Sequence, residues 1–88
     1  MASTYIATFY AHIGAVRFQK LLKSIGSESK MMPVPRSLSS SCGTCVRYTF
    51  ETPVPAGALM DEIEQIVLEE VDASGAIHYI KESVDSFK

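Results

Sequence analysis

Apolar side chains in the first third of the chain are spaced so that they predict a strand followed by a helix. Residues 4–10 are β-branched and aromatic and carry no charge on either face, which predicts a strand in the middle of a sheet. From residue 13 the apolar positions recur at helical spacing, with basic side chains on the opposite face. We expect this helix to end at Gly26, because glycine is the usual residue just past a helix C-terminus.

The remaining patterns predict three further strands and a second helix. Residues 29–35 predict a short strand at a sheet edge, because Pro33 cannot donate a ladder hydrogen bond. Residues 45–51 alternate between apolar and polar side chains and predict another strand. Residues 76–85 begin as a strand and become polar toward their end. Residues 58–72 predict a helix with acidic residues on one face and an apolar stripe of Leu59, Ile63, Ile66 and Val67.

The resulting order of elements, β-α-β-β-α-β, predicts a fold. It is the order of the ferredoxin-like sandwich, an α+β fold with two helices on one face of an antiparallel sheet whose strand order is 4-1-3-2. A single domain over residues 1–88 is expected, and the alternative is another small α+β sandwich with different strand pairing. The sheet face away from the helices would be apolar, so we expect it to be covered by a second copy, giving a homodimer, or by the tail after Ile80.

A long connection between the second and third predicted strands, residues 35–44, carries the candidate chemistry. It exceeds the usual length of a hairpin loop, and Cys42 and Cys45 lie within it or directly after it. Right-handed crossovers would bring this loop to the sheet edge where the first helix begins at His12, and where we also expect the turn at residues 72–75. A helix N-terminus stabilises a thiolate, so this edge is the predicted site.

Charge along the chain supports the same site. Residues 1–50 carry six basic residues and one acidic residue, whereas residues 51–88 carry two basic and nine acidic residues. Both cysteines lie in the basic half, flanked by Arg36 and Arg47, and a basic neighbourhood favours thiolates and anionic ligands. Solvated basic and acidic helix faces would explain the same asymmetry without any function.

Small and polar neighbours extend the predicted site. Gly43 leaves the sulfur of Cys42 open to a partner, and Ser40 and Ser41 can donate hydrogen bonds to sulfur or to a bound anion. His12 could pair with a thiolate, as histidines do in cysteine-nucleophile sites, although a loop histidine with no role is the simpler interpretation.

Other chemistries find less support in the sequence. The second cysteine of the C-x-x-C pair begins a predicted strand rather than opening a helix, so the context of a thioredoxin-type motif is missing. With His12 and His78 far apart in the sequence, one chain offers too few ligands for a structural zinc site, although two chains could supply two cysteine pairs. His78 is interpreted as structural, and we expect no cofactor, no metal and no nucleic acid, because no phosphate-binding or nucleic-acid motif is present.

The chain holds no apolar run long enough to span a bilayer, and its first residues lack the features of a secretory signal. We therefore expect a cytoplasmic protein that does not bind membranes, with cysteines that are reduced or reactive rather than structural.

Two short motifs resemble a known family. "LLKSIG" at residues 21–26 and "PVPRSLSSSCG" at residues 33–43 are similar to the L-L-K-x-x-G and P-V-P-R-x-(L/I)-S-S-S-C-G motifs of the selenium/sulfur carrier-like proteins. The resemblance covers about the first 50 residues. It implies that Cys42 holds sulfur or selenium as a persulfide or selenosulfide. The chain departs from the family at Cys45, where an apolar residue is expected, and this second thiol admits an internal disulfide.

The leading hypothesis is a carrier rather than a turnover enzyme. Cys42 would take the chalcogen from a donor protein and present it to an acceptor protein, with Arg36 and the loop serines steadying the anionic adduct. Cys45 would resolve the adduct by attacking it and releasing the atom. The alternatives are a C-x-x-C thiol-redox or metal-binding module and a non-catalytic dimeric interaction domain.

Overall fold

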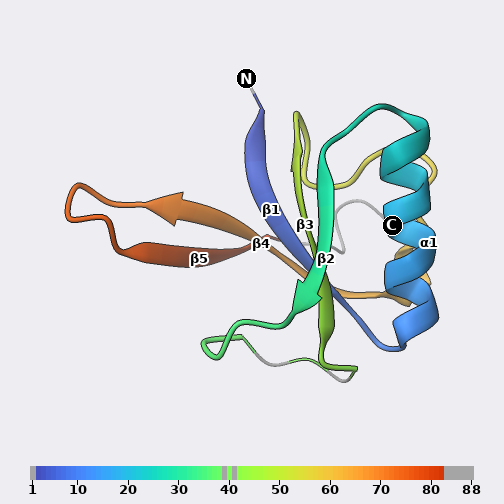
Figure 1. The fold of residues 1–88 in the computed structure, drawn as a ribbon, viewed down its shortest axis with the longest axis horizontal. Coiled ribbons are helices and arrows are strands. Elements are labelled where there is room, and N and C mark those ends of the chain that lie inside the picture. The colour runs from blue at the N-terminus through green and yellow to red at the C-terminus, as the bar shows by residue number, and fades with distance from the viewer. Residues whose placement is uncertain (1, 39, 41, 83–88) are drawn as a thin grey trace.

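The computed structural model describes residues 2–38, 40 and 42–82 (Figure 1). Within this part, five strands form one antiparallel sheet in the order β2-β3-β1-β4-β5, and one α-helix accompanies it. The fold is therefore α+β, as expected. The elements in chain order are β1 (Ser3–Phe9), α1 (His12–Ser24), β2 (Ser29–Pro33), β3 (Thr44–Phe50), the short 3-10 helix η1 (Met60–Glu62), β4 (Ile63–Val71) and β5 (Ile77–Glu82).

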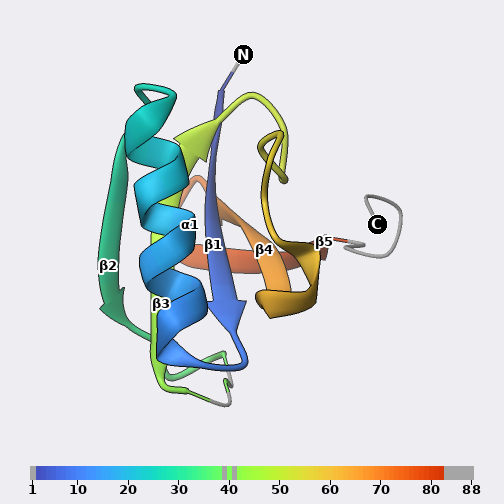
Figure 2. The same cartoon turned by 90° about the vertical axis from the view of Figure 1, so that its right-hand side faces the viewer.

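Helix α1 packs on one face of the sheet, against β2, β3 and β1 (Figure 2). The buried side chains between α1 and the sheet form the main core of the protein. Its centre is aromatic: the ring of Phe18 lies 5.3 Å from that of Phe9 and 5.0 Å from that of Tyr48, centroid to centroid. Such tilted and edge-on pairs are the favoured aromatic geometries. The prediction that β1 is a central strand is confirmed, because it lies between β3 and β4.

The C-terminus of α1 ends as the sequence predicts. Gly26 adopts a left-handed conformation with φ of 74°, which side chains other than glycine rarely tolerate. Its N–H donates to the carbonyl of Lys23 at 3.2 Å, and the N–H of Ser27 donates to that of Leu22 at 2.9 Å. These two bonds form a Schellman motif, which satisfies the last carbonyls of the helix and turns the chain into β2.

The predicted second helix is wrong: residues 63–71 form strand β4. Phe9 of β1 pairs with Ile63 and Ala7 pairs with Ile66, so a bulge shifts the register between them. A bulge adds one residue to one strand, so Ile63 and Ile66 both face α1 although they are three residues apart. That spacing imitates a helical stripe. The β-branched side chains of this segment are better suited to a strand, and the pairing with β1 decides the outcome.

This strand changes the predicted architecture. One helix and five strands do not make the βαββαβ ferredoxin-like sandwich, and β4 rather than the last strand is the neighbour of β1, so the predicted strand order is also wrong. Residues 51–62 lie beside α1 where the second helix was expected (Figure 2), with Pro55 buried and three partly buried side chains packed against the main core, Val54, Ala58 and Met60.

The prediction that the turn at residues 72–75 lies at the same sheet edge as the cysteine loop is also wrong. Because β4 starts beside the end of β1, at the pair Phe9–Ile63, it carries the chain away from the cysteine loop. The turn therefore lies at the far end of the projecting β4–β5 hairpin, whereas the connection from β2 to β3 lies at the lower edge (Figure 1).

A second, smaller core occupies the sheet face away from α1. It consists of Ile6, Cys45 and Val67, all at most 2% exposed. Val34 and Leu38, from the β2–β3 connection itself, pack against it together with Tyr79. The sheet face away from α1 was expected to be covered by a second copy or by the tail after Ile80. The cysteine loop covers part of it instead. The tail beyond Glu82 lies outside the described residues.

The position of Pro33 is as predicted, on the edge strand β2. Its partner across the ladder is Thr44, the first residue of β3. The part of the chain that the structure describes holds no helix with the length and apolar character that crossing a membrane requires.

Candidate functional site

The cysteine loop, residues 34–43, joins β2 to β3. Its base is closed by a hydrogen bond from the N–H of Val34 to the carbonyl of Gly43 at 3.1 Å. Within it, the N–H of Leu38 donates to the carbonyl of Pro35 at 3.0 Å and forms a tight turn. Gly43 has φ of 74°, so this position favours glycine for its backbone conformation, and the space around its Cα is open. Ser39 and Ser41 lie outside the described residues, so the proposed role of Ser41 has no structural counterpart here.

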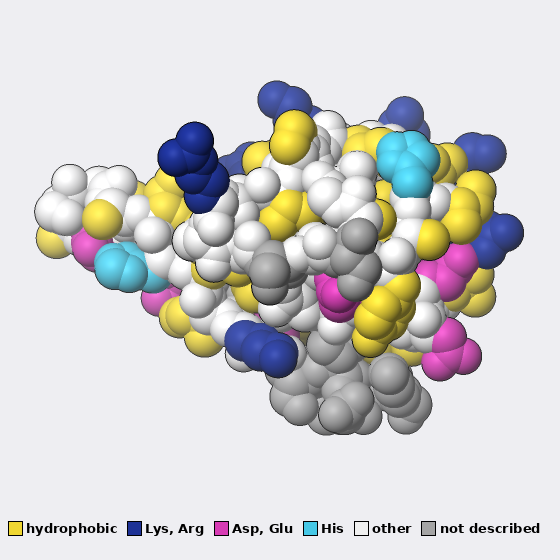
Figure 3. Space-filling model, turned by 90° about the horizontal axis from the view of Figure 1, so that it is seen from below, with side chains coloured by type: hydrophobic (Ala, Val, Ile, Leu, Met, Phe, Trp, Pro, Cys, Tyr) yellow, Lys and Arg dark blue, Asp and Glu magenta, His cyan; other side chains and the backbone are white. Residues whose placement is uncertain are grey.

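The loop lies at the end of β1, just before α1 begins. Figure 3 views the molecule from this edge, where hydrophobic side chains are interspersed with charged ones. The hydroxyl of Ser40 approaches the carbonyl of Phe9, the last residue of β1, at 3.5 Å, which is the long limit of a hydrogen bond. Helix α1 starts with His12, has no acidic residue in its first turn, and receives no side-chain cap from Ala11. Its positive end is therefore not offset by its own sequence.

Cys42 is a free thiol that is partly exposed. Its side chain packs against the main core, on the α1 side of the sheet, and its Sγ donates to the carbonyl of Thr44 at 3.4 Å. A thiol is a weak donor, so this bond holds the side chain only lightly. Cys42 is thus a partly exposed thiol that one weak hydrogen bond holds in place.

Cys45 differs from Cys42 in its exposure and in the face of the sheet that it occupies. It is free but 0% exposed, it belongs to the small core on the opposite face, and its Sγ donates to the carbonyl of Pro33 at 3.7 Å. Burial, with a smaller contribution from the charge of Cys42, raises the pKa of the Cys45 thiol from 9.0 to about 11. Cys45 is therefore a neutral thiol at physiological pH, sealed beneath Val34 and Leu38.

The two predicted basic neighbours also differ. Arg36 is exposed in the turn of the loop. Arg47 is held away from it, because its guanidinium makes two bonds to the carboxylate of Glu69, at 2.7 and 3.3 Å, across the face opposite α1. The hydrogen bonds to Glu69 raise the pKa of Arg47. Only Arg36 remains as an unpaired cation of the loop among the residues described.

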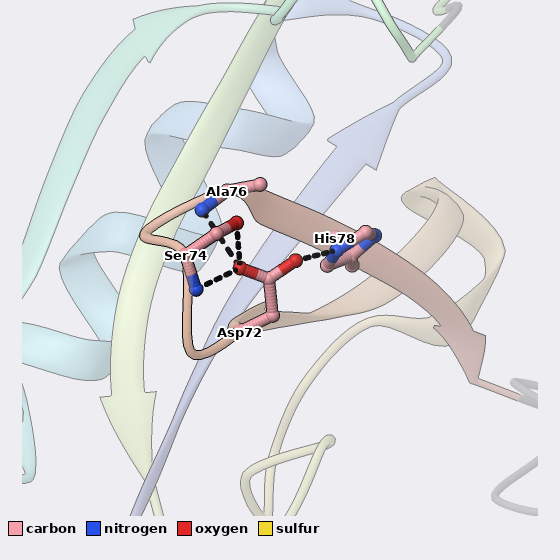
Figure 4. A network of polar contacts seen from close by, with 4 residues as sticks. All are labelled: Asp72, Ser74, Ala76 and His78. Atoms are coloured by element: carbon pink, nitrogen blue, oxygen red, sulfur yellow. Dashed lines mark hydrogen bonds and ion pairs between the residues drawn. The ribbon is translucent and has the colours of Figure 1, made fainter.

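The two histidines lie far apart in the fold. His12 is exposed at the first position of α1, at the same edge as the loop, and within the described contacts it bonds to neither thiol. His78 lies on β5 and contacts Asp72 at 2.7 Å (Figure 4). The other oxygen of Asp72 accepts bonds from the backbone N–H groups of Ser74 and Ala76 and from the Ser74 hydroxyl. The bond from the Ser74 hydroxyl, followed by those from His78 and from the backbone N–H groups, lowers the pKa of Asp72 to about 2. His78 lies on the last strand, as the sequence predicts, and its structural role stays a prediction.

The described residues contain no group of three or more histidine, cysteine or acidic side chains placed to hold a metal ion. The structure also adds residues that the sequence analysis missed. Val34 and Leu38 bury Cys45, and the carbonyls of Pro33 and Thr44 accept from the two thiols. Only Leu38, a single apolar residue within a serine-rich loop, indicated in the sequence that this loop packs against the sheet.

The chain matches the family model described as "Putative Se/S carrier protein-like" over residues 4–71. The matched stretch spans most of the chain and includes β1 except its first residue, α1, the cysteine loop and β4. No curated protein and no solved structure matches the chain.

Proposed function

Because the chain belongs to the Se/S carrier protein-like family, we propose that it carries sulfur or selenium on Cys42. The observation that carries this proposal is the contrast between the two thiols. Cys42 is reachable in a loop beside the start of α1, whereas Cys45 is fully buried on the other face of the sheet. Atom transfer needs a sulfur that both donor and acceptor can reach, which favours Cys42.

The proposed loading step is an exchange without net oxidation. The Cys42 thiolate attacks the outer sulfur of a donor persulfide, the donor's S–S bond breaks, and its electron pair leaves on the donor thiolate. Cys42 then carries the outer sulfur as a persulfide, and an acceptor thiolate reverses the exchange to unload it. A selenosulfide follows the same steps with selenium in the outer position. Because a thiolate cannot donate to the Thr44 carbonyl, Cys42 has to rotate away from that carbonyl before it attacks.

The surroundings of Cys42 support a role in holding an anionic adduct. The start of α1 supplies backbone N–H groups that no acid in its first turn neutralises, and Arg36 is exposed on the same loop. We assign Ser40 and His12 to the rim of this site, from their positions at the end of β1 and the start of α1. Gly43 keeps the position next to Cys42 free of a side chain.

We assign Cys45 a structural role in this proposal rather than a resolving one. Its sulfur would have to leave the small core and pass from one face of the sheet to the other to attack an adduct on Cys42. Unloading is therefore assigned to an acceptor protein. The donor and acceptor proteins, and a cytoplasmic setting that supplies persulfides, are part of the same proposal.

Intact mass after incubation with glutathione persulfide tests the proposal. The wild type and Cys45→Ala should each gain the mass of one sulfur atom, which dithiothreitol removes, and Cys42→Ser should gain none. The matched pair of cysteine variants separates a site-specific adduct from general thiol modification. Loading of Cys42→Ser to the wild-type extent, or no loading of the wild type, would refute the carrier role of Cys42.

A further inference from the structure

The β4–β5 hairpin projects from the rest of the sheet, as Figure 1 shows. It carries large apolar side chains that remain exposed among the described residues. Val71, Ile77 and Ile80 are 64%, 52% and 46% exposed. Ile77 lies opposite Val71 on one face, and Ile80 lies opposite the partly buried Leu68 on the other. A two-stranded ribbon is marginally stable by itself in water, so this hairpin gains from a further strand.

The outer edge of β5 is built to accept such a strand. Its register with β4 is continuous over six pairs, from Ile66–Glu82 to Val71–Ile77. Proteins commonly protect edge strands with proline, with a bulge or with charged side chains such as lysine. The opposite edge of this sheet has Pro33 in β2, whereas β5 has neither proline nor bulge, and its one lysine is Lys81, near the end of the strand. Alternate residues of β5 therefore present backbone N–H and C=O groups outward in regular order.

We propose that β5 pairs with β5 of a second copy of this chain, so that the sheet continues across a two-fold axis. The proposal goes beyond the carrier function and does not depend on it. In this arrangement an antiparallel pair centred on Ile80 places Ile80 opposite Ile80, His78 of one copy opposite Glu82 of the other, and Tyr79 opposite Lys81. The apolar contact is central, and an imidazole meets a carboxylate on each side of it.

Self-complementarity selects this register. A two-fold axis normal to the sheet pairs only residues whose side chains are on the same face, so the pairing must be centred on a residue. Centring on Tyr79 sets His78 opposite Ile80 and Ile77 opposite Lys81. Centring on Lys81 sets two ammonium groups against each other, which is unfavourable for directly opposite side chains. Centring on His78 sets Ile80 opposite Ala76, which lies outside β5. Only the register centred on Ile80 gives an apolar pair and two complementary polar pairs.

The turn prepares His78 for this contact. Asp72 contacts Nε2 of His78 at 2.7 Å and is itself fixed by Ser74 and Ala76 (Figure 4). Among the described contacts His78 uses only this nitrogen, so Nδ1 is left for the carboxylate of Glu82 in the other copy. The imidazole is thus oriented before association, which lowers the entropic cost of the contact.

Light scattering during size-exclusion chromatography, over a range of loading concentrations, tests the association. The wild type should form a concentration-dependent dimer. Ile80→Lys should weaken it by at least roughly tenfold, because it replaces the central apolar pair with two ammonium groups. Ile25→Lys is the matched control, since Ile25 is 45% exposed and lies at the end of α1. A monomer at every concentration, or a dimer that Ile80→Lys leaves intact, would overturn the proposal.

Disulfide cross-linking tests the register, with the reactive thiol removed by Cys42→Ser. Added to that variant, Ile80→Cys should give a covalent dimer on mild oxidation, because directly opposite strand residues lie within disulfide range. Tyr79→Cys, one position along, should give little. Cross-linking that is equal at the two positions, or stronger at Tyr79→Cys, would refute the register.

Native-like amide chemical shifts in Ile80→Lys would confirm that loss of the dimer does not reflect unfolding.

Discussion

Two cysteines that are three residues apart have opposite environments in this chain, and the difference decides their chemistry. Because burial raises the pKa of Cys45 to about 11, its thiol stays neutral and enclosed at pH 8. Iodoacetamide at that pH should therefore modify only Cys42 in the folded protein and both cysteines in denaturant. Mass spectrometry of the digested protein checks this. Equal modification of both thiols in the folded state would contradict the burial of Cys45.

The same burial predicts a loss of stability at alkaline pH. Cys45 has a pKa of about 11 when folded against an ordinary value of 9.0, so the unfolded chain loses this proton first. The stabilisation that comes from this raised pKa is complete below pH 9 and is lost as the pH rises toward 11. The free energy of unfolding should therefore fall by roughly 2–3 kcal/mol over this range. Urea unfolding at pH 8 and pH 11 measures the change.

Cys45→Ala in a Cys42→Ser background is the comparison protein for this pH dependence. It should lose less stability between the two pH values than Cys42→Ser alone. Tyr48, whose pKa burial also raises, is present in both proteins and affects them equally. The same pH dependence in the two proteins would show that Cys45 does not titrate in this way.

Residue by residue, the sequence predicted where the cysteine loop lies better than it predicted the surroundings of each side chain in the candidate site. The motif around Cys42, the glycine beside it and the nearby start of α1 were all readable from the chain. The separation of the two thiols was not, because it depends on which face of β3 carries Cys45 and on Leu38 folding back over it. Arg47 was likewise assigned to the loop, and its partner Glu69 could be known only from the sheet register.

Among the elements, β4 shows why a strand was predicted as a helix. The bulge opposite Thr8 and Phe9 lets two apolar residues three positions apart face the same core, which is the spacing of a helical stripe. A sequence pattern records spacing and not pairing partners, so it cannot distinguish a bulged strand from a helix. β3 has no bulge, and α1 ends at a glycine cap. The sequence pattern of each therefore fits one type of element, and both were predicted correctly.

The cysteine loop acts as a lid on the small core, and a single truncation should open it. Leu38→Ala removes apolar contact from above Ile6, Cys45 and Val67. We expect Cys45 to become modifiable by iodoacetamide at pH 8, with a loss of about 1–2 kcal/mol of stability, because Leu38 is only partly buried. Ser37→Ala, at the exposed neighbouring position, is the matched control and should leave Cys45 protected. Unchanged protection in Leu38→Ala would mean that other residues seal the thiol.

Across the whole molecule, the sheet separates two cores of unequal size. The main core holds four buried aromatic rings between α1 and the sheet, whereas the small core holds three buried residues beneath the loop. Since apolar area buried sets most of the stabilisation, the main core should determine whether the chain folds. The small core should determine how firmly the cysteine loop is held, which links the stability of one face to the exposure of the candidate site.

Phe18→Ala and Leu38→Ala test this division in one experiment. Phe18 is 4% exposed and touches the rings of both Phe9 and Tyr48, so its truncation should cost about 3–5 kcal/mol. A domain of this size has a total stability near the lower end of about 5–15 kcal/mol, so Phe18→Ala should lose most of it. Leu38→Ala should keep a cooperative transition and the full helical circular dichroism signal while its loop opens. Urea titrations followed by circular dichroism compare the two variants, and a cost for Leu38→Ala equal to that for Phe18→Ala would show that the two cores form one unit.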